Sequence, residues 1–463
     1  MIDWQNKRVV VDGIGQEGQA MVEYLLGEGA HVTVCDEREP EALGEIYLAW
    51  QSRGVAWQLG PAYLQDLTSF SVVVRSPGVS PHLQPLKAAM KRGVTVTSLT
   101  KIFFELCPCP IIGVTGTKGK GTTSTLIWKM LTAARKKVVL VGNIGAPAIS
   151  VLADLTPKHT VVYELSSFQL QDLDRSPHIA VALGITLEHQ DYHRSPEEYY
   201  AAKANIVRYQ TPNDIAVLNT DYPTTATFRP LVRGQAFTVT RGYLAGDGVA
   251  ITPEGVVRHS HGKVDRICRR EEVRLKGDHN LENVAAAVAA ASAAGVSVAA
   301  MRRVIREFSG LPHRLEFVAD VSGVEYWNDT YGTTPEGVIA AVRSFTEPIV
   351  LLLGGSEKGL TYEVLADVIV KSTVKTIVGI GLSAEKIYAV VKQAATKTGL
   401  KAPAYVEGGA TMEAMLKTAR KFAKSGDAVL LSPAAASFDR FKNASDRGDQ
   451  FRDVVHSLTT PQE

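Results

Sequence analysis

The most constraining feature of this sequence is a glycine-rich stretch, GVTGTKGKGTT at residues 113–123, which directly follows the apolar run PII. A strand that enters a glycine turn and then a helix leaves backbone N–H groups unpaired at the helix N-terminus, where the helix dipole favours an anion. Lys120 adds a charge that can reach terminal phosphates, and a threonine hydroxyl behind it can hold Mg²⁺. We therefore predict an ATP site, with a polar surface turn as the alternative.

The spacing of this loop is unusual. It reads G-x-x-G-x-x-G-K, and Gly121 separates Lys120 from the next hydroxyl, so that Thr122 becomes the candidate Mg²⁺ ligand. The predicted ATP-binding residues of the loop are Gly116, Thr117, Lys118, Gly119, Lys120, Gly121, Thr122 and Thr123.

The composition is that of an ordinary globular protein, and the length of 463 residues suggests about three domains. The formal net charge of +2 gives no basic field, so we expect no nucleic-acid partner and no membrane partner. The N-terminus lacks the apolar region of a signal peptide, and no apolar run reaches the roughly 20 residues of a membrane helix. Four cysteines fit reduced thiols, so we expect a cytoplasmic protein. We also expect a monomer.

Strands and helices alternate along most of the chain, which predicts an α/β fold with parallel sheets. A proline-punctuated stretch at 107–110 precedes the phosphate loop, and the pattern shortens into polar, hairpin-like runs between 235 and 275. We predict three domains: a Rossmann-like domain over 1–107, a central P-loop ATPase-type α/β domain over 108–310, and a Rossmann-like domain over 311–463.

A second glycine motif lies near the N-terminus, where Gly13, Gly15 and Gly18 are followed by Asp36. The spacing matches the dinucleotide fingerprint and, taken alone, predicts NAD. Any nucleotide diphosphate can use the same turn, and a tight turn without a ligand is a third possibility.

Three residues of the second segment carry candidate chemistry. Glu164 closes an apolar strand beside the phosphate loop and is a candidate Mg²⁺ ligand, with a capping or ion-pairing role as the alternative. His189 could join a second metal site or be a hydrogen-bonded structural histidine. Lys203 lies on a helical pattern, where an exposed helix face is the default interpretation.

Candidate nucleotide contacts flank the break near residue 310. Asn280 fits a helix N-cap, and Asn283, one turn later, could read an adenine edge. Arg314 and Asp329 could engage ATP phosphates across a closing domain cleft.

In their order these motifs resemble those of the Mur ligase family of ATP-dependent amide-bond ligases. The resemblance spans essentially the whole chain and comprises VTGTKGKGTT, GNIG at 142–145, ELSSFQ at 164–169, LEHQDYH at 187–193, YAAK at 200–203, GDHNLEN at 277–283, LPHR at 311–314 and WND at 327–329. RSPGVSP at 75–81 and LLSPAAASFDRFKN near the C-terminus are most similar to the branch that adds D-glutamate to UDP-N-acetylmuramoyl-L-alanine.

The resemblance implies a UDP-sugar, rather than NAD, at the N-terminal glycine motif. Its implied contacts are Gly15, Gln16, Glu17, Gly18, Glu37, Arg38, Ser76, Pro77 and Gly78, with Asn143 at the muramoyl-alanine portion. ATP would be held by the phosphate loop with Asn280, Asn283, Arg314 and Asp329. The implied catalytic residues are Lys120, Lys203, His189, Arg314 and Asp329, and two Mg²⁺ ions would be held by Thr122, Glu164, His189 and a carbamylated Lys203.

The resemblance also implies a reaction in peptidoglycan precursor synthesis. ATP would convert the substrate carboxylate into an acyl phosphate, which the amine of an amino acid then attacks. Domain closure would exclude water, because hydrolysis of the acyl phosphate would waste ATP.

Three departures from the D-glutamate-adding pattern concern the amino-acid end and the loop. Tyr331 replaces a lysine, Ala444 stands where an aromatic is expected, and Gly121 resembles folylpolyglutamate synthases. The predicted contacts for the glutamate carboxylates are Thr333, Lys358 and Ser437. We predict D-glutamate first, L-glutamate second, as in a related branch that adds it, and another amino acid third.

Two other classes compete with a ligase. An NAD-dependent dehydrogenase fits the first fifty residues but leaves the phosphate loop and Glu164 unexplained. A non-catalytic paralogue would fit the same fold, although all the groups expected for phosphate and metal binding are present.

Overall fold

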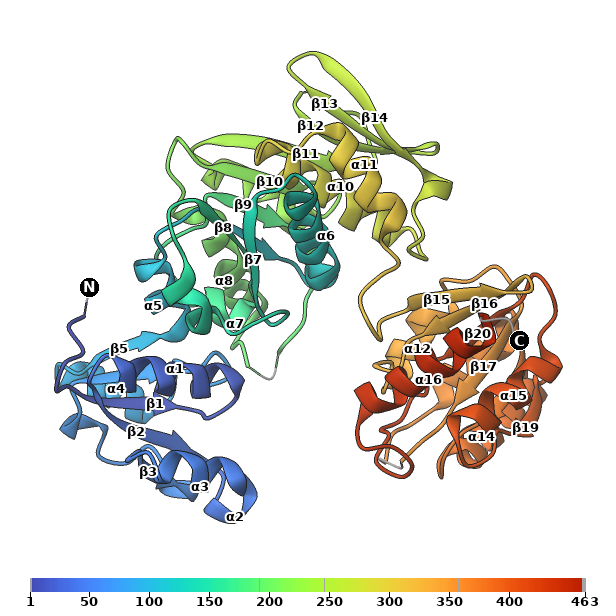
Figure 1. Cartoon of the computed structure of the whole chain (residues 1–463), viewed down its shortest axis with the longest axis horizontal. Helices are drawn as coiled ribbons and strands as arrows, with labels where there is room; N and C mark the ends of the chain where they lie inside the picture. The colour runs from blue at the N-terminus through green and yellow to red at the C-terminus, as the bar shows by residue number, and fades with distance from the viewer. Residues whose placement is uncertain (1, 191, 245, 357–358, 460–463) are drawn as a thin grey trace. The chain divides into compact units, whose positions relative to one another are not determined.

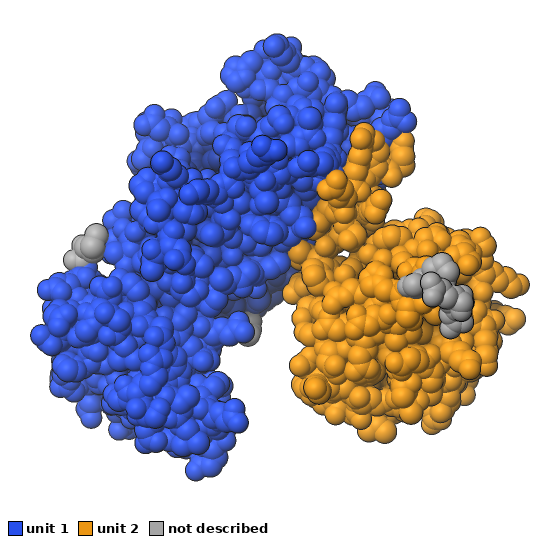
Figure 2. All heavy atoms as spheres, viewed as in Figure 1, with its two compact units in different colours: residues 1–270, 281–305 blue, residues 271–280, 306–463 orange. Residues whose placement is uncertain are grey.

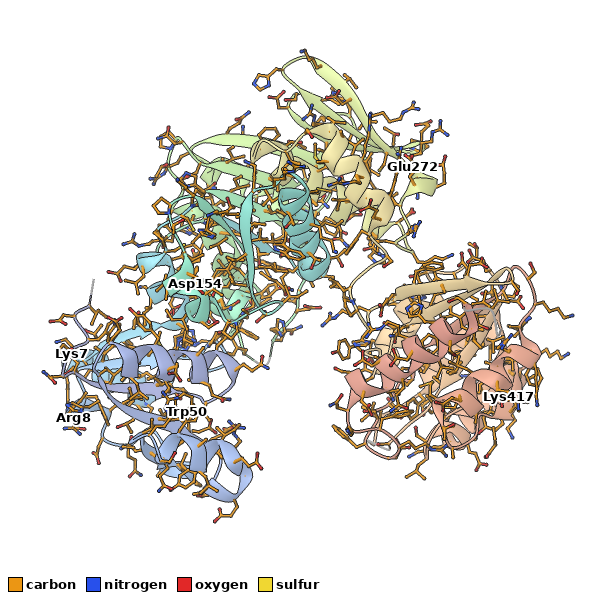
Figure 3. The ribbon with its side chains drawn as sticks, viewed as in Figure 1. Lys7, Arg8, Trp50, Asp154, Glu272 and Lys417 are labelled. Atoms are coloured by element: carbon orange, nitrogen blue, oxygen red, sulfur yellow. The ribbon has the colours of Figure 1, made fainter. Side chains whose placement is uncertain are left out.

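The computed structural model describes residues 2–190, 192–244, 246–356 and 359–459, and these fall into two compact units (Figure 2). Unit 1 contains Met1–Arg270 and Leu281–Ile305, and unit 2 contains Glu271–Asn280 and Arg306–Glu463. Unit 1 holds two sheets and unit 2 holds one (Figure 1). Figure 3 shows side chains on the ribbon of all three sheets, and buried apolar side chains give each sheet its own core.

The first sheet has five parallel strands in the order β3-β2-β1-β4-β5. Its strands are β1 Arg8–Asp12, β2 His31–Asp36, β3 Ala56–Leu59, β4 Val72–Arg75 and β5 Thr95–Ser98, and its helices are α1 Gln16–Gly27, α2 Pro40–Leu43, α3 Glu45–Gln51, α4 Gln84–Lys91 and α5 Leu99–Leu106. The valine runs of β1 and β4 are buried on both faces, as a parallel sheet covered by helices requires. The chain leaves β1 towards β2 on one side and returns to β4 on the other. In open α/β sheets, ligands bind at the carboxyl ends of strands where the strand order reverses in this way.

The second sheet of unit 1 has nine strands in the order β14-β13-β12-β11-β10-β9-β6-β8-β7. Its strands are β6 Ile111–Thr115, β7 Lys137–Gly142, β8 His159–Glu164, β9 Ile179–Ala182, β10 Ile215–Asn219, β11 Gln235–Thr240, β12 Gly248–Thr252, β13 Gly255–Ser260 and β14 Lys263–Arg269. The accompanying helices are α6 Lys120–Ala133, α7 Ser167–Leu170, α8 Pro196–Arg208, α9 Pro223–Ala226, α10 His279–Ala293 and α11 Val298–Glu307. The polar runs between 235 and 275 form β11 and the antiparallel meander β12–β14, which extends the parallel sheet.

The sheet of unit 2 has six strands in the order β15-β16-β20-β17-β18-β19. Its strands are β15 Glu316–Val321, β16 Val324–Asn328, β17 Ile349–Leu353, β18 Val374–Gly379, β19 Ala404–Glu407 and β20 Ala428–Leu431, with helices α12 Pro335–Val342, α13 Glu363–Lys371, α14 Ala384–Thr398, α15 Met412–Phe422 and α16 Ala444–Thr459. Among the described strands of this sheet, β15 alone runs antiparallel, as the outer strand of a hairpin with β16.

The short segment Glu271–Asn280 packs with unit 2 although it precedes α10 in the chain. The Nζ atom of Lys276 lies 2.6 Å from the Glu347 carboxylate and 3.3 Å from that of Glu325. The same ammonium lies 5.3 Å from the ring centre of Trp327, so this segment closes one side of the unit 2 core.

The structure therefore confirms an α/β fold built on three sheets. One local expectation was wrong: α10 begins at His279, so Asn280 lies inside its first turn instead of capping it, and its amide donates to the Lys276 carbonyl (2.7 Å). Across the described ranges, no helix is long and apolar enough to span a bilayer.

Candidate active site

The phosphate loop joins the central strand β6 to helix α6. The strand extends through Thr115, the turn occupies residues 116–119, and the helix begins at Lys120. Gly119 adopts a φ of +83° before the first helical residue, a conformation that favours glycine. The loop therefore presents its N–H groups at a helix N-terminus, as the sequence predicts.

Two lysine ammonium groups meet at one backbone carbonyl of this loop. Lys120 Nζ donates to the Gly116 carbonyl at 3.1 Å and to the Thr117 carbonyl at 3.0 Å. Lys203 Nζ donates to the same Gly116 oxygen at 2.9 Å and to Thr115 Oγ1 at 3.4 Å. The chain has thus gathered two amines where a phosphate is expected, which concentrates positive charge if both are protonated.

Lys203 is buried, with 2% of its surface exposed, so the default interpretation of an exposed helix face was wrong. It projects from α8 beneath the loop, and its Nζ atom lies 5.0 Å from the ring centre of Tyr199. Burial and the neighbouring charge of Lys120 hold the pKa of Lys203 well below its ordinary value. A lowered pKa increases the fraction of the neutral amine, which is the form that acts as a nucleophile.

Tyr199 also fixes the loop from below. Its hydroxyl lies 3.0 Å from Thr117 Oγ1, which in turn donates to the Thr186 carbonyl and accepts from the Thr186 N–H, both at 2.8 Å. The phosphate loop is thus bonded to the chain that leaves β9, and these contacts hold Thr117 in a buried position.

The carboxyl ends of strands next to β6 bring the other candidate residues to the same edge. Glu164 ends β8 and is buried, and it pairs in register with Gly142 of β7, which precedes the exposed Asn143. His189 follows β9 in an exposed turn with a φ of +55°. β8 and β9 are the two neighbours of β6, so Glu164 and the His189 turn flank the phosphate loop.

The donor set suits a cation held largely by phosphate oxygens. In the part of the chain that the structure describes, no three His, Cys, Asp or Glu side chains converge closely enough to form a metal site by themselves. Mg²⁺ commonly uses one or two carboxylates together with substrate phosphates and waters. Thr122, half-buried in the first turn of α6, Glu164 and His189 offer a hydroxyl, a carboxylate and an imidazole of the required kinds.

Asn283 packs directly against the loop. A Cβ atom built on Gly119 would lie 2.1 Å from Asn283 Oδ1, so only glycine fits there. The buried Thr123 hydroxyl donates to the same amide oxygen at 3.4 Å, which leaves Thr122 as the more accessible hydroxyl of the turn.

The three predicted UDP-binding turns follow three adjacent strands, β2, β1 and β4. Gly15 caps α1, and Gln16 and Glu17 begin it, while Gly18 packs so tightly that a Cβ would lie 2.0 Å from the Gly13 carbonyl. Ser76 Oγ donates to that carbonyl at 3.1 Å, which joins the turn after β1 to the turn after β4. Glu37, Arg38, Pro77 and Gly78 lie in the two flanking turns.

Asp36, the acidic residue of the dinucleotide fingerprint, is already engaged. It accepts the Ile14 N–H at 3.0 Å and two bonds from the Arg38 guanidinium at 2.7 and 2.8 Å. Although burial opposes ionisation, these bonds lower the pKa of Asp36. The Asp36 carboxylate therefore organises the turn that holds Arg38, which weakens the case for NAD.

In unit 2, Arg314 lies just before β15 and Asp329 just after β16. Because these two strands are antiparallel, both residues lie at the same edge of the sheet. Asp329 follows β16; its Oδ2 accepts from Ser432 Oγ at 2.6 Å and its Oδ1 accepts from the Leu315 N–H at 3.1 Å. Burial raises the pKa of Asp329 to about 6, although these bonds and Arg314 oppose the rise. The exposed Arg314 guanidinium lies 5.9 Å from the ring centre of Tyr331.

The predicted amino-acid contacts share this edge of the unit 2 sheet. Thr333 follows β16, and Ser437 lies in the loop after β20, the next strand in the sheet. Ser437 Oγ is buried and makes no hydrogen bond within the described residues. Tyr331 Oη pairs with Ser445 Oγ at 2.7 Å. Lys358 lies outside the described residues.

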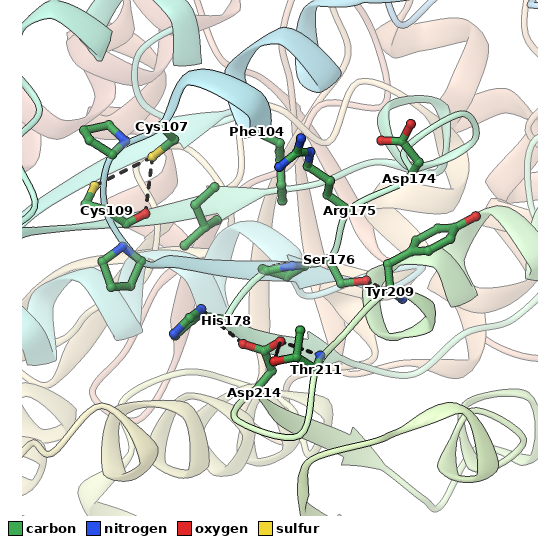
Figure 4. A pocket seen from close by; sticks show the side chains of 14 residues that line it. Phe104, Cys107, Cys109, Asp174, Arg175, Ser176, His178, Tyr209, Thr211 and Asp214 are labelled. Carbon is green, nitrogen blue, oxygen red and sulfur yellow. Dashed lines mark hydrogen bonds and ion pairs between the residues drawn. The ribbon is translucent and has the colours of Figure 1, made fainter. Parts of the chain in front are cut away.

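Sequence reasoning missed the aromatic and arginine contacts that join the two sheets of unit 1. Tyr192, Phe168 and Arg75 all stand inside motifs noted above, but nothing in the spacing indicates that they touch. It also missed a cleft of about 490 Å³ beside the 107–110 stretch (Figure 4), lined by Cys107, Cys109 and the contacting side chains of His178 and Asp214. That cleft contains none of the predicted site residues.

Comparisons with known proteins cover the whole chain. Family models match over residues 7–98 (Mur ligase MurD-like, N-terminal domain), 114–291 (Mur ligase middle domain) and 313–435 (Mur ligase, glutamate ligase domain). A protein of Symbiobacterium thermophilum named UDP-N-acetylmuramoylalanine–D-glutamate ligase is 38% identical over 455 residues, covering 98% of each chain. Proteins of the same name from Pelotomaculum thermopropionicum (38%, covering 98% of this chain and 99% of theirs) and Acetivibrio thermocellus (36%, covering 98% and 97%) are also similar.

Solved structures support the architecture. A UDP-N-acetylmuramoyl-L-alanyl-D-glutamate–2,6-diaminopimelate ligase superposes with a TM-score of 0.59 at 18% identity, covering 100% of this chain and 95% of that one. The UDP-N-acetylmuramate–alanine ligase MurC of Thermotoga maritima gives a TM-score of 0.56 at 18% identity, covering 98% and 100%. At this identity the likeness concerns the fold alone.

Proposed function

This chain belongs to the Mur ligase family, on its MurD-like branch, and from that premise we propose that it joins D-glutamate to UDP-N-acetylmuramoyl-L-alanine with ATP. The step belongs to peptidoglycan precursor synthesis. The observation that carries the proposal is the phosphate loop on β6, with Lys120 at its helix end and the buried Lys203 bonded to its Gly116 carbonyl.

The reaction needs ATP because a carboxylate is a poor electrophile. Phosphorylation of the substrate carboxylate gives an acyl phosphate, and the D-glutamate amine attacks its carbonyl carbon as phosphate leaves. The backbone N–H groups of residues 116–123 and the Lys120 ammonium stabilise the charge on the phosphates during transfer. Lys120 is bonded to its own loop, so it is already positioned before ATP binds.

Mg²⁺, when bound, neutralises the phosphate oxygens in transfer. Thr122, Glu164 and His189 are the residues of this chain that would hold it, together with Lys203 as a carbamate. Lys203 suits carbamylation because a neutral amine is the form that reacts with CO₂, and its pKa is lowered by burial and by Lys120. A carbamate would also convert the repulsion between the two lysines into attraction.

The remaining predicted contacts bind and orient substrates. The turns at residues 15–18, 37–38 and 76–78 hold the uridine diphosphate, and Asn143 contacts the muramoyl-alanine portion. Asn280 and Asn283 serve the adenine side of ATP. Arg314 and Asp329 serve its phosphates, while Thr333, Ser437 and Lys358 take the glutamate carboxylates. The domain limits 1–107, 108–310 and 311–463 stay predictions.

One assay tests the proposal. Phosphate release is measured with ATP, UDP-N-acetylmuramoyl-L-alanine and either D- or L-glutamate, side by side. We expect release with D-glutamate and little with L-glutamate, and no change in nicotinamide absorbance. Preference for L-glutamate would favour the alternative branch, and absence of release with either amino acid would contradict a glutamate ligase.

We further propose that the enzyme acts in the cytoplasm as a monomer and without nucleic acid. All four cysteines are free thiols, which suits a reducing compartment. Sedimentation equilibrium at micromolar concentration, expected to give about 50 kDa, tests the monomer.

A further inference from the structure

The first and second sheets of unit 1 meet at the hydroxyl of a half-buried tyrosine, Tyr192. Its Oη atom lies 3.0 Å from the carbonyls of both Pro77 and Val79, which belong to the turn after β4. Arg75 NH1 donates to the same hydroxyl at 3.3 Å and also to the Val79 carbonyl. The hydroxyl therefore accepts one bond and donates its proton to the turn that is proposed to hold the uridine diphosphate.

Arg75 is held rigidly beside this contact. It ends β4 with only 1% of its surface exposed, and its NH2 atom lies 3.0 Å from a carboxylate oxygen of Asp172. Asp172 follows α7, which belongs to the second sheet of unit 1, so residues of both sheets hold the guanidinium in place. A buried guanidinium with an ion pair and several carbonyl partners has little freedom to move, and Tyr192 is bonded to it directly.

Two sets of contacts connect Tyr192 to His189. The backbone N–H groups of Tyr192 and His193 donate to the His189 carbonyl at 3.2 and 3.0 Å, which closes the turn. The Phe168 ring centre lies 4.2 Å from that of Tyr192 and 4.8 Å from that of His189, so one ring packs against both. Phe168 belongs to α7, four residues after Glu164.

The backbone of His189 shows why this support is needed. Its φ of +55° lies in the left-handed region, which is unfavourable for a residue with a Cβ. Such a conformation persists only where the surroundings impose it. Here the surroundings are the turn that Tyr192 closes and the Phe168 ring.

We propose that Tyr192 is a positioning residue that couples occupancy of the 76–79 turn by the UDP-sugar to the placement of His189 beside the phosphate loop. The inference rests on the proposed function. By linkage the coupling is reciprocal, so the UDP-sugar and the nucleotide with its cation strengthen each other's binding through this contact.

The experiment measures binding as well as turnover. By titration calorimetry, the affinity for UDP-N-acetylmuramoyl-L-alanine is measured with and without Mg²⁺ and a non-hydrolysable ATP analogue, and Mn²⁺ affinity is measured by electron paramagnetic resonance with and without the UDP-sugar. The variants are Tyr192→Phe, which removes only the hydroxyl, and Tyr209→Phe, whose exposed phenol at the end of α8 serves as the matched control.

In the wild type and in Tyr209→Phe we expect each ligand to raise the affinity of the other about fivefold or more. In Tyr192→Phe we expect this ratio to fall close to one, while affinity for the UDP-sugar alone changes less than twofold. An unchanged ratio in Tyr192→Phe, or a ratio of one in the wild type, would overturn the inference.

A second variant, Phe168→Leu, decides the matter if Tyr192→Phe fails to fold, because it removes the ring between Tyr192 and His189 and keeps an apolar side chain. We expect the same loss of coupling, and full coupling would overturn the inference. If the wild type neither binds the UDP-sugar nor releases phosphate, the proposed function fails and the inference falls with it. If it does both and only the coupling persists in the variants, the inference alone fails.

Discussion

Asp329→Asn should make unit 2 more stable while it removes a charge that the proposed reaction uses. The half-buried Asp329 carboxyl accepts hydrogen bonds from the Ser432 hydroxyl and the Leu315 N–H. An asparagine fits the same contacts, because its amide oxygen can accept from Leu315 and its NH₂ group can donate to Ser432. The substitution therefore changes the charge and keeps the packing.

The magnitude follows from the pKa. Burial raises the pKa of Asp329 from the ordinary value of 3.8 to about 6, and each pH unit is worth about 1.4 kcal/mol, so ionisation of the native carboxyl costs about 3 kcal/mol. Between these two pH values the native state binds more protons than the unfolded state, so its stability falls as the pH rises through the window. An asparagine amide does not titrate, so Asp329→Asn should match the wild type near pH 4 and exceed it by up to about 3 kcal/mol above pH 7.

Native-state hydrogen exchange measures this locally, which suits a chain of two units. Peptides over β16 and β20 report on unit 2, and peptides over β1 report on unit 1 as an internal reference. Asp320→Asn, at an exposed aspartate in the β15–β16 hairpin, is the matched control and should leave the pH dependence unchanged. Parallel stability curves for wild type and Asp329→Asn between pH 4 and 8 would refute the reasoning.

Three further substitutions test the phosphate loop. Lys120→Ala should lower kcat for phosphate release by about 100-fold or more, because it removes a preorganised charge from the phosphates. Lys129→Ala, on the exposed face of the same helix, should leave kcat unchanged. Equal activities of the two variants would contradict this role for Lys120. Labelled bicarbonate should give a carbamate carbon resonance in the wild type that is absent from Lys203→Arg, and its absence from the wild type would argue against carbamylation of Lys203. Gly119→Ala should destabilise unit 1 by about 1–3 kcal/mol and raise KM for ATP, since its Cβ would meet Asn283 at a strained φ. Gly27→Ala, where a Cβ meets nothing, should leave KM for ATP unchanged. A similar KM for both variants would count against the proposed packing.

Much of the fold follows from local patterns in the sequence. Valine runs such as that of β1 are buried on both faces, and glycine turns follow β1 and β6 where the sequence predicts them. The sequence indicated the meander β12–β14 only as polar, hairpin-like runs, because its strands mix buried and polar residues without strict alternation. The helix start at His279 was misplaced by two residues, since several residues around it can cap a helix.

The candidate site was predicted unevenly, for physical reasons. Motifs at strand ends are gathered by the parallel topology itself, so Glu164 and His189 could be assigned to one edge from the sequence. The burial of Lys203 could not be predicted from the sequence, because it depends on how α8 packs under the phosphate loop. The contact between Tyr192 and Arg75 joins residues 117 positions apart, which no local pattern specifies.

The placement of Glu271–Asn280 has a consequence for where the chain can be cut. A fragment that starts at residue 311, where the motifs suggest a boundary, would lack Lys276 and leave Glu325 and Glu347 facing each other with their shared cation removed. The faces of Trp327 and Phe345 would lose the ammonium that covers them. A fragment of unit 2 that retains residues 271–280, spliced ahead of residue 306, is the version expected to fold independently. Excision of residues 281–305, more than simple truncation, therefore matches how this polypeptide divides.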